Sequence, residues 1–294
     1  MTAPAQEVAE EPADATPGIV IRAPRPQRWV HRLPRWIRVA SMSVLFFFFF
    51  TGCPVIALAL IPTLRLFYRD HRRRVTVMLN KGLRFIVWAA RFLGTVDFDY
   101  PDLPASVKPD EPYVLICNHP TYVDMLLLLG SFPEMACVTS GRWSHHWALG
   151  PVLRATDYLP GPGSGLPESE NMLESMVAHL RSGRSLLVFP EGQRSMKDKL
   201  RRFRKGAVQA AVEANVPIVP MFLGIDRPYL TKGVPLWRPP KPAPIYTFEW
   251  FEVVRPEAFD GDAKRIQSHF EEQYKARFAA QRAHQLAVAT PATA

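Results

Sequence analysis

The sequence predicts an α/β domain, a mixed sheet flanked by helices, preceded by an N-terminal membrane-associated helical segment. Two observations support this. From residue 94 onward, short apolar runs of strand length alternate with segments of helical length, the pattern of an α/β fold. Ahead of them lies an uncharged stretch of 26 residues, Val39 to Leu64, which is longer than the roughly 20 residues that a membrane-spanning helix requires.

The chain divides into four predicted parts. Residues 1–27 are rich in Ala, Pro, Glu and Thr and lack an apolar period, so we expect them to be disordered. Residues 28–93 form the membrane-associated segment, residues 94–284 the globular domain and residues 285–294 a loose tail. Within the domain, the expected strands are 95–98, 113–117, 136–139, 185–189, 218–222 and 245–251, and the expected helices are 124–129, 171–181, 206–214 and 262–283.

Composition narrows the class of partner. Lys and Arg exceed Asp and Glu by nine, and such a surplus indicates an anionic partner: a phosphorylated ligand, an anionic membrane or nucleic acid. The basic stretch lacks interleaved aromatics, so we expect no nucleic acid partner. The three cysteines form no CxxC pair, which argues against a disulfide framework, and we expect no metal site.

The apolar stretch from 39 to 64 has two interpretations. It is either a single transmembrane anchor or a re-entrant hairpin that is interrupted at Gly52, Pro54 and Pro62. Basic residues flank both ends, and the heavier cluster follows the stretch, which predicts a cytoplasmic domain under either interpretation. The next segment, 75–93, predicts an amphipathic helix that lies in the membrane interface or packs on the domain.

The segment from Asn118 to Asp124 carries the first candidate catalytic residues. His119 suits general base chemistry because its ordinary pKa is near neutral, and a carboxylate such as Asp124 can fix its tautomer. Five positions apart, they meet only if His119 lies in a loop and Asp124 in the first helical turn, and Pro120 favours that break. Taken alone, the pair is equally explained by a loop histidine and a helix-start aspartate.

A second candidate site follows the strand 185–189. Gly192 allows close backbone approach, and Arg194 offers a fork of donors for phosphate. An ordinary turn with a Glu191–Arg194 ion pair is the alternative. The next stretch, from Arg194 to Lys205, holds seven basic residues and one acid, and it leads into a helix.

These segments resemble the motifs of the glycerolipid acyltransferases, the lysophosphatidate acyltransferase family. Asn-His-Pro-Thr-Tyr-Val-Asp is similar to the family's His-x4-Asp motif, and Phe-Pro-Glu-Gly-Gln-Arg-Ser at 189–195 to its Phe-Pro-Glu-Gly-x-Arg-Ser motif. Phe-Arg-Lys-Gly at 203–206 and Val-Pro-Ile-Val-Pro at 216–220 resemble the later motifs, in the family's order. The resemblance covers roughly residues 98–251.

The resemblance implies an O-acyltransferase. His119 would be the base and Asp124 its orienting carboxylate, while Glu191, Gly192, Arg194 and Lys205 would bind the acceptor. It implies no cofactor and no metal, with acyl-CoA or acyl-carrier protein as the donor substrate and membrane lipids as partners. The expected location is a membrane, such as a bacterial inner membrane, with the domain facing the cytoplasm. The alternative is a catalytically silent lipid-binding relative.

One motif departs from the family. The second motif usually ends in Gly-x-Ile-x-x-x-Arg, and its Arg contributes to glycerol-phosphate binding. The corresponding stretch here, residues 153–163, has no Arg at that place. Arg142 and Arg154 are the nearby candidates to replace it, and the departure leaves room for an acceptor other than lysophosphatidate.

Overall fold

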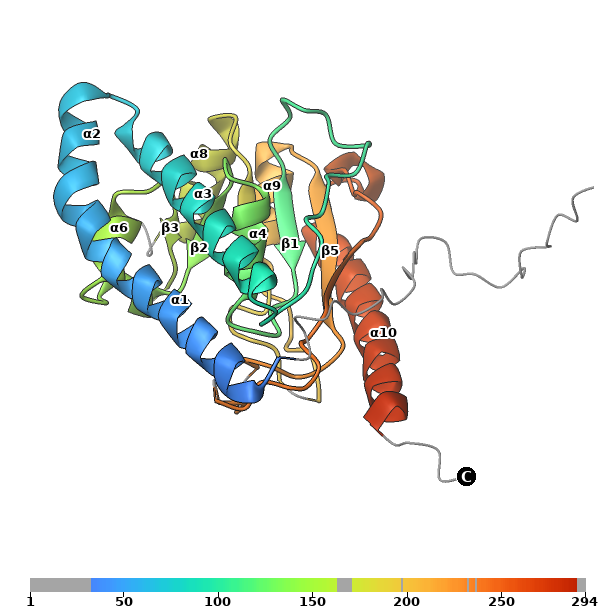
Figure 1. Cartoon of the computed structure of the whole chain (residues 1–294). Coiled ribbons are helices and arrows are strands. Elements are labelled where there is room, and N and C mark those ends of the chain that lie inside the picture. Colours follow the sequence, from blue (N-terminus) through green and yellow to red (C-terminus); the bar gives the residue numbers. More distant parts are fainter. Residues whose placement is uncertain (1–32, 163–170, 197, 232, 236, 290–294) are drawn as a thin grey trace, which may run out of the picture.

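The computed structural model describes residues 33–162, 171–196, 198–231, 233–235 and 237–289. The predicted disordered segment 1–27 and the last five residues lie outside these ranges. In the described part, helices pack on both sides of a central sheet, and a pair of long N-terminal helices covers one side of the molecule (Figure 1).

The sheet is mixed, as predicted. Six strands run in the order β3-β2-β4-β1-β5-β6, parallel except for the β5–β6 pair. Val114 of β1 pairs with Leu186 of β4 on one side and with Ile218 of β5 on the other, so β1 is central and wholly buried. The strands are β1 (Val114–Cys117), β2 (Ala136–Thr139), β3 (Leu159–Pro160), β4 (Leu186–Val188), β5 (Ile218–Ile225) and β6 (Tyr246–Trp250).

The sheet differs from the prediction in two places. The segment 95–98 is buried but makes only a single bridge, Asp97 to Ile245, so its apolar residues line the core without joining a ladder. The edge strand β3 was not predicted because it has only two residues, too few for an alternating pattern.

The domain helices follow the prediction closely. They are α4 (Asp124–Ser131), α8 (Met172–Arg181), α9 (Gly206–Ala214) and α10 (Ala263–Ala289), with a 3₁₀ turn at Pro256–Phe259. The α10 helix runs through Ala289, five residues into the predicted tail. Two short helices, α5 (Gly141–Ser144) and α6 (Leu149–Arg154), were not predicted.

The apolar stretch forms one bent helix and contains no hairpin. The α1 helix (Arg35–Val55) continues through a π-helical turn at Ile56–Leu60 into α2 (Ile61–Phe67) (Figure 1). The expected break at Gly52 and Pro54 is absent. A π turn shifts the backbone hydrogen bonds by one residue, which accommodates a proline and bends the helix without ending it.

The α3 helix (His71–Phe92) runs back beside α1 and packs on α4. Its buried face includes Leu83 and Val87, whereas Phe85, Trp88 and Phe92 on the other side are 50–64% exposed. The basic residues Lys81 and Arg84 are exposed as well, so the helix is amphipathic as predicted, although its outer face also carries aromatic side chains. Of the two predicted placements, the structure shows the one on the domain, with α3 between α4 and the α1–α2 helix.

Candidate active site

The loop after β1 brings His119 and Asp124 together. The strand ends at Cys117, and α4 begins at Asp124, so His119 lies in the loop and Asp124 in the first helical turn, as the five-residue spacing required. Nδ1 of His119 is 2.9 Å from Oδ2 of Asp124. The aspartate side chain is fully buried and the histidine side chain is 20% exposed.

The surroundings of Asp124 fix the tautomer of His119. Oδ2 also accepts a hydrogen bond from the backbone N–H of Thr121 at 2.6 Å, and Oδ1 accepts one from the Thr121 hydroxyl. An ionised carboxylate accepts hydrogen bonds only, so this network places a proton on Nδ1. The Nε2 atom then carries the lone pair and is the one ring atom able to take a proton.

The segment after β4 holds the histidine loop from the other side. The Ser195 N–H donates to the His119 carbonyl at 2.7 Å, and the His119 N–H donates to Oε1 of Glu191 at 3.2 Å. The ring of Phe189 stacks on the imidazole, with ring centroids 4.3 Å apart. The two motif segments, 72 residues apart in sequence, therefore form one site.

The Glu191 carboxylate is an internal acceptor. It is buried and also accepts hydrogen bonds from the Ser195 hydroxyl at 2.5 Å and from the Arg201 N–H at 3.0 Å. Burial raises the pKa of Glu191 despite these hydrogen bonds. Glu191 therefore joins the turn 191–195 to the histidine loop and positions the backbone of His119.

Gly192 and Arg194 shape the turn itself. Gly192 has φ +66°, a conformation that side chains rarely adopt, and a Cβ there would lie 2.8 Å from Nε of Arg204 and would require that side chain to move. The Arg194 guanidinium lies 3.5 Å from the centroid of the Tyr122 ring and donates from Nη2 to the Tyr122 hydroxyl at 2.9 Å. Its Nη1 is buried and has no hydrogen bond partner among the described residues.

Comparison with known proteins identifies the domain. The family model described as Acyltransferase matches residues 100–224, which contain both motif segments and the whole of α9. The coconut palm (Cocos nucifera) protein named 1-acyl-sn-glycerol-3-phosphate acyltransferase is 28% identical over 165 residues, 54% of this chain and 50% of that protein. Both matches support the glycerolipid acyltransferase family for the segment that contains the two motifs.

Two further relatives extend the comparison. The lyso-ornithine lipid O-acyltransferase of Pseudomonas aeruginosa is 27% identical over 150 residues, 50% of this chain and 54% of that protein. The crystal structure of the 1-acyl-sn-glycerophosphate acyltransferase from Thermotoga maritima matches with a TM-score of 0.61 at 20% identity, covering 84% of this chain and 98% of that chain, which shows the shared fold. The chain spans about half the length of the curated relatives it matches.

The acyltransferase domain does not bring every predicted site residue together. Lys205 is exposed at the N-terminus of α9, and no hydrogen bond or ion pair among the described residues joins it to the His119 loop. Arg154, a candidate to replace the missing motif arginine, donates instead to the Ser144 carbonyl at 2.5 Å, and Arg142 is exposed. No described group of three or more His, Cys, Asp or Glu residues is arranged to hold a metal ion.

Three supporting residues of the acyltransferase site were not singled out from the sequence. The Asn118 side chain donates to the Leu223 carbonyl and accepts from the Leu223 N–H, at 2.9 and 2.7 Å, which ties the loop to β5. Thr121 holds Asp124, and Phe189 covers the imidazole. The position of Thr121 three residues before a helix-start Asp was an available signal, since side-chain to backbone bonds are common there.

Proposed function

We propose that this chain is an O-acyltransferase that moves a fatty acyl group from a thioester to a lipid hydroxyl at a membrane. The contact between His119 Nδ1 and Asp124 Oδ2 carries this proposal, because it leaves Nε2 as a base whose charged form the aspartate stabilises. The match to the acyltransferase family model supports the same reaction.

The reaction needs no covalent acyl-enzyme. Nε2 of His119 takes the proton from the acceptor hydroxyl as its oxygen attacks the thioester carbonyl. The C–S bond then breaks, and the leaving thiolate takes the proton from the imidazolium. The three cysteines are buried, and burial raises the pKa of Cys117, so the thiol beside the histidine loop is kept protonated and is a poor nucleophile.

The acceptor we propose is a lysophospholipid or related lipid with an anionic group. The stacked, planar Arg194 presents a buried Nη1 that has no described partner, and a guanidinium fork suits phosphate or carboxylate. The relatives are named for two different lyso lipids. Because the second-motif arginine is missing, we propose weaker discrimination in favour of lysophosphatidate than in typical members of the family.

The α1–α2 helix supports attachment to a membrane. Arg35–Phe67 is 33 residues long, and its most apolar window has a mean hydropathy of 2.6 and is 17% buried. Its outer face exposes Phe47, Phe48 and Leu58. The basic residues that follow favour a cytoplasmic acyltransferase domain, as on a bacterial inner membrane, and acyl-CoA or acyl-carrier protein would supply the acyl group.

The test is an acceptor panel with purified full-length chain in mixed vesicles. Acyl-CoA and acyl-carrier protein are each offered with lysophosphatidate, lyso-ornithine lipid and lysophosphatidylcholine, and products are identified by mass spectrometry. We expect diacyl product with the anionic acceptors. No product from any donor–acceptor pair would favour the silent lipid-binding alternative.

The role of Arg194 is tested in the same assay. Arg194→Lys keeps the charge but loses the fork, so we expect the acceptor KM to rise about tenfold, the effect of one lost charge-assisted hydrogen bond, with kcat little changed. The matched control is Arg142→Lys, an exposed arginine in α5. An unchanged KM in Arg194→Lys would contradict the proposed acceptor site. An exclusive preference of the wild type for lysophosphatidate would contradict the weaker discrimination proposed from the missing arginine.

A further inference from the structure

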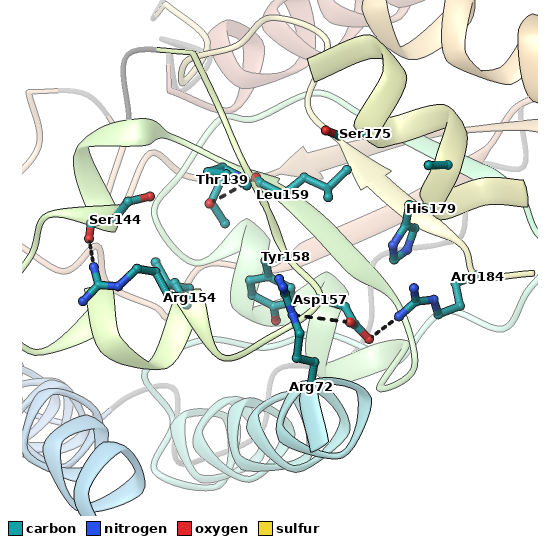
Figure 2. Close-up of a pocket in the computed structure, with 13 residues that line it drawn as sticks. Arg72, Thr139, Ser144, Arg154, Asp157, Tyr158, Leu159, Ser175, His179 and Arg184 are labelled. Atoms are coloured by element: carbon teal, nitrogen blue, oxygen red, sulfur yellow. Dashed lines mark hydrogen bonds and ion pairs between the residues drawn. The ribbon is translucent and has the colours of Figure 1, made fainter. Parts of the chain in front are cut away.

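A cavity lies at the β3 edge of the sheet, away from the candidate active site. It has a volume of about 470 Å³, and its walls come from the N-terminal end of α3, from α6, from β2 and β3 and from α8 (Figure 2). Because β2 and β4 lie between β3 and β1, roughly 14 Å of sheet separates β3 from β1, the strand that ends just before His119. Among the described residues, no hydrogen bond or ion pair joins a lining side chain to those of His119, Asp124, Glu191 or Arg194.

The lining of this β3-edge cavity is rich in positive charge. The guanidinium groups of Arg72, Arg154 and Arg184 and one carboxylate, that of Asp157, line it. Arg72 and Arg184 face Asp157, whereas the Arg154 guanidinium points toward Ser144 (Figure 2). The Asp157 side chain is 10% exposed and is shared: Arg184 Nη1 lies 2.6 Å from Oδ2, and Arg72 Nε lies 4.0 Å from Oδ1. The carboxylate therefore offsets one of the three charges, and Arg154 has no acidic partner among the described residues.

His179, which also lines the cavity, adds no positive charge to it. Burial, and then the nearby charge of Arg184, lowers the pKa of His179 to about 4, so its ring is neutral at physiological pH. Ser144, Ser175 and Thr139 add hydroxyl groups to the lining, and Leu153 and Leu159 add apolar surface. A net charge of about +2, carried by guanidinium groups, suits an oxyanion.

The neighbouring backbone holds Arg154 in place, and this arrangement requires a glycine at position 150. Its Nη1 donates to the Ser144 carbonyl at 2.5 Å. A Cβ on Gly150 would lie 2.5 Å from that carbonyl oxygen and 3.0 Å from the same Nη1, so glycine permits the approach of both groups. Among the described residues, no hydrogen bond uses Nε or Nη2 of Arg154, and these atoms remain for a ligand.

We propose that the β3-edge cavity binds a phosphate-type oxyanion, at a site separate from the proposed acyl-transfer site, with Arg154 as its main ligand. Two sources share this chemistry. Arg72 lies in the first turn of α3, just after α2, whose Leu66 and Phe67 are 78% and 70% exposed, so a phospholipid head group at a membrane surface has access from that side. A soluble phosphomonoester is the other source. The inference does not depend on the proposed function, because its test requires no turnover.

The first arm measures binding of inorganic phosphate by the full chain in neutral detergent, by calorimetry. Every sample carries Arg194→Gln, so that phosphate at the proposed acceptor site does not contribute. We expect Arg154→Gln to weaken phosphate binding about tenfold or more, as the loss of a charge-assisted hydrogen bond does. Arg142→Gln removes the same charge from a residue outside the cavity and should leave binding unchanged.

The second arm measures flotation with phosphatidylcholine vesicles that contain or lack phosphatidylglycerol. A selective loss of binding to the anionic vesicles in Arg154→Gln, relative to Arg142→Gln, would identify a lipid head group. A selective loss in the phosphate arm would identify a soluble ligand. If Arg154→Gln does not fold, Arg154→Lys keeps the charge but loses the fork and is compared with Arg142→Lys. Equal behaviour of the Arg154 and Arg142 variants in both arms would overturn the proposal.

Discussion

His119 is held at three points: its Nδ1 by Asp124, its backbone N–H by the Glu191 carboxylate and the face of its ring by Phe189. The sequence predicted the first of these contacts because Pro120 makes a loop histidine and a helix-start aspartate compatible. The contact to Phe189 could not be predicted, because it depends on the order of β4 and β1 in the sheet, which no local pattern specifies.

Asp124→Asn should preserve the size of the side chain but remove the charge that stabilises the imidazolium. We expect kcat to fall by about 10²-fold or more, while the thermal midpoint changes less than in a deletion of the side chain. Initial rates of acyl transfer measure the effect. Asp110→Asn, at an exposed position, is the matched control, and similar rates for the two variants would contradict the role of Asp124.

The lowered pKa of the buried His179 predicts that the stability of the fold depends on pH. Its pKa is lowered to about 4 in the folded state, and the ordinary value is about 6.5. Above pH 6.5 both states are neutral and the stability is fully present. As the pH falls toward 4, the unfolded state takes up a proton that the folded state resists, so stability is lost, by about 2 kcal/mol at pH 5.

Urea unfolding at pH 7 and pH 5 measures this loss. His179→Gln should reduce the difference in unfolding free energy between the two pH values by about that amount. The exposed His145 provides the control, since His145→Gln should leave the difference as it is in the wild type. An undiminished difference in His179→Gln would show that other groups cause the acid sensitivity.

At the scale of elements, strands and helices differ in how far the sequence predicts them. The apolar runs of β1, β2 and β5 predicted strands because a buried parallel sheet requires continuous apolar residues. The hairpin interpretation of 39–64 fails because Pro54 and Pro62 bend a helix whose neighbours α3 and α6 pack along it. The prolines are local signals, whereas the packing that keeps the helix continuous is tertiary.

The crossing of α3 and α4 supplies a paired test. A Cβ on Gly130 would lie 2.9 Å from Cα of Arg84 in the α3 backbone, whereas nothing lies within 4 Å of a Cβ on Gly82. Gly130→Ala should therefore destabilise by about 1–3 kcal/mol through overpacking. Gly82→Ala, the same change inside a helix, should stabilise by about 0.5–1 kcal/mol.

Denaturant unfolding of both alanine variants checks the paired test. Opposite signs are the expected result, since only Gly130 touches a neighbouring backbone. A neutral effect of Gly130→Ala would mean that α4 can move away from α3 at little cost. Because α4 begins at Asp124, such a shift would also bear on the geometry of the proposed site.

At the scale of the whole molecule, an apolar outer surface of α1–α2 lies beside a folded acyltransferase domain. The described residues contain one helix, Arg35–Phe67, that is long and apolar enough to cross a membrane. Its inner face packs through Cys53, Ile61 and Leu64 on α3 and α6, which explains why the stretch is apolar on both sides. The sequence predicted membrane association but could not predict that one face is used for packing.

The exposed face gives a prediction for membrane binding. Phe47→Ser combined with Phe48→Ser removes two side chains that are each 64% exposed, so we expect weaker flotation with vesicles and a nearly unchanged unfolding free energy. Leu103→Ser, in the loop before β1, is the control. Flotation equal to that of the wild type would place the membrane contact elsewhere.

The most direct test of the proposed mechanism is the rate of acyl transfer by His119→Ala, measured as lipid product by mass spectrometry with the best donor and acceptor of the panel. Loss of a general base typically costs ~10²–10⁴-fold, and we predict a decrease in kcat of that size with an unchanged thermal midpoint and unchanged vesicle binding. His145→Ala, which removes an exposed histidine outside the site, should retain wild-type turnover. Near-normal product formation by folded His119→Ala would contradict the account, because no other described residue is placed to take the hydroxyl proton beside Asp124.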